Sequence, residues 1–311
     1  MQSTPSAAHA IDPPRVEFAT LFVAAAIYGG WIAATLVHDR LSPWILPLVG
    51  GWLLAWHGSL QHETIHGHPT PWRWANTLLA FAPLNLWLPY QRYRQTHQAH
   101  HAAEHLTEPG SDPESRYLSG AAGGLRRWVA RASATLLGRL TLGPVIEIAG
   151  FLTAEIRAVA ADEAGVRRAW AIHLAAVAVV LFWLVAVCRF SLSGYVAAFV
   201  YPGCALSLLR SFAEHRADPV AARRIAVVER APILGLLFLN NNLHAAHHAF
   251  PHASWRRLPG LYAQHRESLL TDNGGLVYRG YGEVVRRYLL SPHDVIVHPG
   301  RLGLDPAVGG V

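Results

Sequence analysis

The chain has 311 residues, of which 52% are hydrophobic and only 15% are charged, and it contains 11 Trp. Globular domains carry about 25% charged residues, so this composition excludes an ordinary soluble domain and indicates an integral membrane protein with a sizeable polar part. All 26 basic residues are Arg, and the formal net charge is +6. No nucleic-acid-binding motif accompanies this charge, which therefore favours a membrane surface over nucleic acid as its partner.

Apolar runs long enough to cross a bilayer as a helix, about 20 residues, occur four times along the chain. The predicted spans are at about 16–37, 43–60, 169–189 and 194–210. They form two hairpins, and Pro202 is expected to kink the last of them.

Two further stretches are apolar but interrupted. Pro83 and Asn85 break the run at 72–90. The run at 143–160 carries three charged residues, which is typical of an amphipathic helix at a membrane surface. Neither is predicted to cross the membrane.

The positions of the Arg residues predict the orientation. If both hairpin turns face outward, only Arg40 and Arg189 lie outside, and every other Arg lies in a tail, a large loop or an inner helix end. Because cytoplasmic segments carry the excess of positive charge, we expect both termini and both large loops to be cytoplasmic.

Histidine is the outlier of the composition, with 19 residues. The segments HETIH (62–66), HQAHH (97–101) and HAAHH (244–248) each place their imidazoles on one helical face, because residues three and four apart are neighbours there. A further candidate follows the fourth apolar run. The nine candidate metal ligands are His62, His66, His97, His100, His101, His215, His244, His247 and His248.

Neighbouring histidines within a cluster indicate more than one metal ion. His100 and His101 point about 100° apart on a helix, as do His247 and His248, so each pair can serve two ions. Nine imidazoles also exceed the four ligands of a tetrahedral zinc site. All clusters fall in segments predicted to be cytoplasmic, and a shared site requires that residues 72–90 do not cross the membrane.

The segment HETIH is formally the HExxH signature of zinc proteases, with Glu63 as the general base. A membrane zinc protease would leave both HxxHH clusters unused, and would need an Asp ligand that spans three and four do not contain. A non-enzymatic metal-binding or transport protein is the other remote alternative. Transporters hold their ions near the midplane of the membrane, whereas these clusters flank the spans.

The three clusters in this order, with hairpins between them, resemble the membrane fatty acid desaturase superfamily. The flanking segments RSFAEHR and NNNLHAAHHAFPHASWRRLP are similar to its bacterial desaturase-like branch, although Ser254 stands where Pro is common. The resemblance spans about residues 16–265, which it implies to be the membrane domain, between an N-terminal tail (1–15) and a C-terminal tail (266–311). It implies an all-α integral membrane protein with four transmembrane helices in two hairpins and a cytoplasmic helical cap that carries the histidines.

The resemblance also implies a centre of two iron ions, held by the nine histidines, with O2 as co-substrate and electrons from a separate donor such as a ferredoxin. The implied reaction is desaturation of a fatty acyl chain of a lipid, in a bacterial inner membrane. Hydroxylation or ketolation of a lipid or carotenoid at the same centre is the alternative. Carboxylates close in sequence to the ligands could orient them: these are Glu63, Glu104, Glu108, Asp112 and Glu214. His68 and His105 are further candidates for that outer layer.

Overall fold

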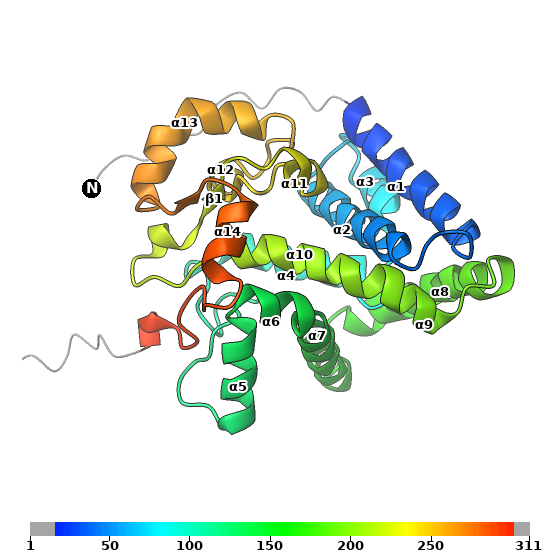
Figure 1. Cartoon of the computed structure of the whole chain (residues 1–311), viewed down its shortest axis with the longest axis horizontal. Helices are drawn as coiled ribbons and strands as arrows, with labels where there is room; N and C mark the ends of the chain where they lie inside the picture. The colour runs from blue at the N-terminus through cyan, green and yellow to red at the C-terminus, as the bar shows by residue number, and fades with distance from the viewer. Residues whose placement is uncertain (1–15, 302–311) are drawn as a thin grey trace, which may run out of the picture.

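The computed structural model describes residues 16–301 and is mostly helical (Figure 1). The first half contains α1 (Phe18–Leu36), α2 (Ile45–Ile65), α3 (Arg73–Ala80), α4 (Tyr90–Ala102), α5 (Gly124–Ser133), α6 (Leu136–Thr141) and α7 (Gly143–Ala160). The second half contains α8 (Val166–Phe182), α9 (Leu192–Tyr195), α10 (Tyr201–Glu214), α11 (Pro232–Leu237), α12 (His244–Ala249), α13 (Leu258–Asp272) and α14 (Tyr281–Tyr288). Two short strands, β1 (Val227–Val228) and β2 (Val277–Tyr278), pair in parallel.

Three helical segments are long and apolar enough to cross a membrane: Phe18–Leu36, Val166–Val187 and Leu192–Glu214. They match the first, third and fourth predicted spans. The second predicted span forms α2, which has 21 residues and packs against both α1 and α10. The last two turns of α2 carry Gln61, His62 and Glu63, and these polar residues lower its apolar character.

The stretch 72–90 contains one helix, α3, of only 8 residues, followed by irregular chain up to α4. A helix of this length rises about 12 Å, far less than the roughly 30 Å of a hydrocarbon core. The structure therefore agrees with the expectation that this stretch does not cross. The stretch 143–160 forms the single helix α7, whose outer side exposes Val145 and Ile156.

The predicted kink at Pro202 coincides with an irregular helix. Two π-helical turns, Trp183–Val187 and Val196–Val200, interrupt the second hairpin, and the second of them ends just before Pro202. Such turns replace the regular hydrogen bonds of an α-helix, which suits a segment where a proline supplies no N–H.

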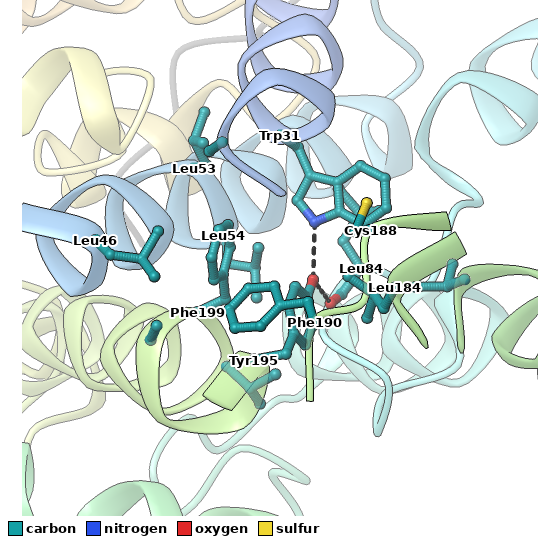
Figure 2. Close-up of a cluster of buried hydrophobic side chains, with 14 residues drawn as sticks. Trp31, Leu46, Leu53, Leu54, Leu84, Leu184, Cys188, Phe190, Tyr195 and Phe199 are labelled. Carbon is teal, nitrogen blue, oxygen red and sulfur yellow. Dashed lines mark hydrogen bonds between the residues drawn. The ribbon is translucent and has the colours of Figure 1, made fainter. Parts of the chain in front are cut away.

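The half of the molecule that contains the candidate spans has an aromatic core that ties α1 to α9 and to the loop after α3 (Figure 2). The indole of Trp31 donates a hydrogen bond of 2.9 Å to the hydroxyl of Tyr195, which donates one of 2.6 Å to the carbonyl of Leu84. Tyr195 also stacks on Phe199. These bonds satisfy the polar ends of buried aromatic side chains and fix the loop against the spans.

Close packing of α2 on α10 depends on glycine. A Cβ atom on Gly203 would lie 2.6 Å from the Cβ of Leu54, which leaves no room for a side chain. We expect Gly203→Val to lower the free energy of unfolding by about 1–3 kcal/mol, the usual cost of overpacking a core. Thermal unfolding in detergent measures this change. Gly29→Val is the control, because a Cβ at Gly29 meets nothing within 4 Å, and an equal loss in both variants would contradict the packing account.

Residues 266–301 pack onto the rest of the molecule. The predicted domain boundary falls inside α13, and β2 pairs with β1 across it. Tyr278 and Val284 lie in one buried cluster with Phe212 of α10. The helices α12 and α14 thus lie near the end of α10 that leads into His215, and α13 packs on α12 (Figure 1).

Candidate metal centre

All nine predicted histidines lie together, in two adjacent groups. Within each group, one possible ligand atom per residue lies within 4.8 Å of all the others. The first group contains His62, His66, His97, His101 and His247, and the second contains His100, His215, His244 and His248. Rings from the two groups also meet, since His101 stacks on His248 with 4.5 Å between ring centroids.

Local helix geometry explains this division. His97, His100 and His101 lie on α4, and His247 and His248 lie on α12. In each adjacent pair one imidazole joins the first group and the other joins the second, because successive residues point in different directions on a helix. The spacing in the sequence predicted this separation.

The ligand atoms face one another closely. The Nε2 atoms are 3.0 Å apart in the pair His66–His97, and also 3.0 Å apart in His101–His247. In the second group, His215–His244 and His244–His248 are 2.9 and 3.1 Å apart. Two nitrogens bound at right angles to one ion at about 2.1 Å lie about 3.0 Å apart, so these separations fit metal ligation.

Two further observations fit metal ions. The Nε2 atom of His100 is buried and has no hydrogen-bond partner among the described residues, although buried polar atoms are normally paired. Burial and the neighbouring imidazoles lower the pKa of His101 to about 3 and that of His215 to about 4. Both rings are therefore neutral at pH 7, which is the form that binds a metal.

Carboxylates hold the far nitrogens of two rings. Asp112 accepts a hydrogen bond of 2.8 Å from Nδ1 of His100, and Glu114 accepts one of 3.0 Å from Nδ1 of His97. Partial desolvation opposes charge on Glu114, but the hydrogen bond from His97 and the nearby imidazoles hold its pKa well below its usual range. These bonds place the free Nε2 atoms toward the centre. Sequence reasoning named Asp112 and missed Glu114.

Around His244, a second polar network includes Asn241, which sequence reasoning also missed. The side-chain oxygen of Asn241 lies 3.1 Å from Nδ1 of His244, and its amide donates a 3.1 Å bond to Glu214. Glu214 was predicted for this outer layer and lies 3.4 Å from the same His244 nitrogen. The run of three Asn just before HAAHH was the available signal.

The other predicted outer residues lie elsewhere. Glu63 accepts a hydrogen bond of 3.1 Å from the backbone of Trp255. His68 pairs with Glu17 at 2.8 Å. Glu104 and His105 are exposed to solvent. Glu63 and His68 thus form these bonds with groups outside the nine histidines.

Comparison with known proteins agrees with this geometry. The sequence profile of the fatty acid desaturase family matches residues 39–281, a stretch that contains all nine histidines. The chain belongs to the fatty acid desaturase family. No curated protein matches the chain at a significant level. Membership of the desaturase family implies oxidoreductase activity.

In this desaturase family member, a cavity of about 920 Å³ reaches the second histidine group at His215. Its walls come mainly from α2, α5, α7 and α10. The apolar lining includes Leu54, Trp87 and Phe151. Three ion pairs supply most of its charge: Arg92–Glu155, Arg116–Glu147 and Arg210–Glu214. Each of these three Arg side chains is matched by a carboxylate, so the pairs themselves add no net charge to a mainly apolar cavity.

Proposed function

We propose that the chain is a membrane di-iron oxygenase that uses O2, and electrons from a separate donor such as a ferredoxin, to desaturate a fatty acyl chain of a lipid. The two groups of histidines, each built from several helices, carry this proposal. Imidazole ligands alone suit Fe, Cu, Ni and Zn, so the choice of iron rests on the family. A soluble bundle would use carboxylate ligands instead.

The nine histidines would hold the two iron ions, which supply the activation of O2 that removal of hydrogen from an unactivated C–H bond requires. The chain's own residues supply position and environment. Asp112 and Glu114 orient His100 and His97 through their Nδ1 atoms. Asn241 orients His244. The apolar walls of the cavity hold an acyl chain and exclude water from the reacting carbon.

For the membrane arrangement we propose four spans, with α2 as the second. It has the length of a span, about 31 Å at 1.5 Å per residue, and it lies between α1 and α10. The excess of Arg on the histidine side supports a cytoplasmic location for the centre and both termini. In a bacterium this places the protein in the inner membrane.

Product analysis tests the reaction. Lipids from a host with and without the gene are compared by mass spectrometry, and His248→Ala is the inactive control. Desaturation predicts a product that has lost two hydrogens, whereas hydroxylation adds one oxygen. An oxygenated product with no new double bond would contradict the desaturase assignment while leaving the oxygenase intact.

The cavity makes a separate prediction about the acyl chain. Gly150 lines the cavity, and a Cβ atom there meets nothing within 4 Å. We expect Gly150→Leu to fill part of the cavity and to shift the preferred substrate toward shorter chains, with roughly tenfold lower activity on the original one because misplacement of the reacting carbon is costly. Product profiles across a series of chain lengths measure this. Gly29→Leu is the control, and an unchanged profile in Gly150→Leu would place the substrate elsewhere.

A further inference from the structure

The helix α5 differs from every other element around the cavity. It has 10 residues, none of them buried, and it runs crosswise to α10 (Figure 1). It lies in a stretch, residues 115–146, that contains five Arg and no acidic residue. A helix with no buried residue gains little stability from packing against the protein. Its apolar side chains must therefore contact another surface.

Its side chains divide into two faces. The residues that line the cavity recur at helical spacing: they are Leu125, Arg126, Val129, Ala130 and Ser133. The opposite face carries Arg127, Trp128 and Arg131, which are also one turn apart. Trp128 is 58% exposed. Among residues 16–301, neither Arg127 nor Arg131 forms an ion pair with a carboxylate.

The side of α5 that faces the cavity also carries polar groups that could bind a ligand. The hydroxyl of Ser133 is buried and lacks a hydrogen-bond partner in the described part of the chain. Its backbone carbonyl accepts a 3.0 Å bond from Arg139, whose guanidinium also lies over the ring of Phe212. An unpaired hydroxyl beside a guanidinium suits an oxygen-rich, negatively charged group.

We propose that α5 lies in the headgroup layer of the cytoplasmic leaflet and binds anionic phospholipid, so that it forms the mouth through which a lipid enters the cavity. This inference rests on the proposed membrane function. Trp128 takes the position that an indole prefers at a membrane surface. Arg127 and Arg131, on either side of it, meet lipid phosphates, while the inner face guides the chain toward the histidines.

The neighbouring surface favours lipid over an acidic protein partner. The helix α7, which α6 joins to α5, exposes Val145 and Ile156 at 62% and 70%. Apolar side chains at this density continue the lipid-facing surface of the spans. Because this face combines cations with apolar residues, it matches a bilayer surface that is negatively charged and apolar just below.

Quenching of Trp128 by brominated lipids tests the proposal. The protein is placed in nanodiscs of phosphatidylcholine that contain a small fraction of either brominated phosphatidylglycerol or brominated phosphatidylcholine. The Trp128 signal is the difference between the native chain and Trp128→Phe. We expect stronger quenching by the anionic lipid, and a preference about tenfold weaker in Arg127→Gln/Arg131→Gln, because each Arg contributes to the attraction.

The matched control is Arg167→Gln/Arg168→Gln, which removes two exposed Arg at the start of α8 and should keep the preference at Trp128. An equal preference in the native chain and in the α5 variant, or no quenching of Trp128 by either lipid, would overturn the proposal. The measurement needs neither metal nor turnover. Absence of product with the expected quenching would therefore reject the proposed reaction alone.

Discussion

Alanine at His248 is expected to remove one metal ion and leave the other. His248 is one of four histidines in the second group, so its loss leaves three. His247, the adjacent residue, is one of five in the first group. We therefore expect His248→Ala to retain about one ion per chain, and His247→Ala to retain two, with one held more weakly.

Activity should fall by more than 100-fold in His248→Ala, because changes in the outer residues of metal sites already cost about 10- to 100-fold. Elemental analysis and turnover on purified protein measure both effects. His105→Ala is the control, since His105 is exposed and lies just after α4. Full metal content and full activity in His248→Ala would show that His248 is not a ligand, and would contradict the second group as a metal site.

The substitution Glu114→Gln is expected to lower metal affinity or activity about 10- to 100-fold. The carboxylate of Glu114 accepts a 3.0 Å hydrogen bond from His97, and the surrounding imidazoles keep it ionised. Glutamine preserves the shape but removes the charge that raises the basicity of His97. Its side chain is 36% exposed because it lines the cavity, so folding should survive the change.

Competition with a chelator, followed by metal analysis, measures the retention directly. Glu104→Gln is the matched control, because Glu104 is exposed and ten residues away in sequence. Equal retention in the two variants would show that Glu114 does not orient a ligand.

Much of this centre could be predicted from the sequence, because its ligands follow helical spacing. His100 and His101 divide between two groups for the same reason that any two successive helical residues diverge. Apolar length predicted α1, α8 and α10 in the same way. These features depend on the geometry of one continuous segment, so the sequence of that segment is enough to predict them.

The positions of the residues that were not predicted depend on how loops fold back toward the histidines. Glu114 reaches His97 from 17 positions away, through a loop held partly by Thr107, whose amide donates a 2.7 Å bond to Asp112. Asn241 contacts both Glu214 and His244, which belong to different helices. Neither of these contacts produces a periodic pattern in the sequence from which it could be predicted. The packing of Tyr278 beside Phe212 likewise joins distant segments.

The central claim is that nine histidines hold two iron ions. It is tested most directly by metal identity and stoichiometry on detergent-purified protein, grown with iron and handled without oxygen. The account predicts two irons per chain. One zinc per chain, retained in His248→Ala but lost in His66→Ala, would make HETIH a zinc site and contradict it.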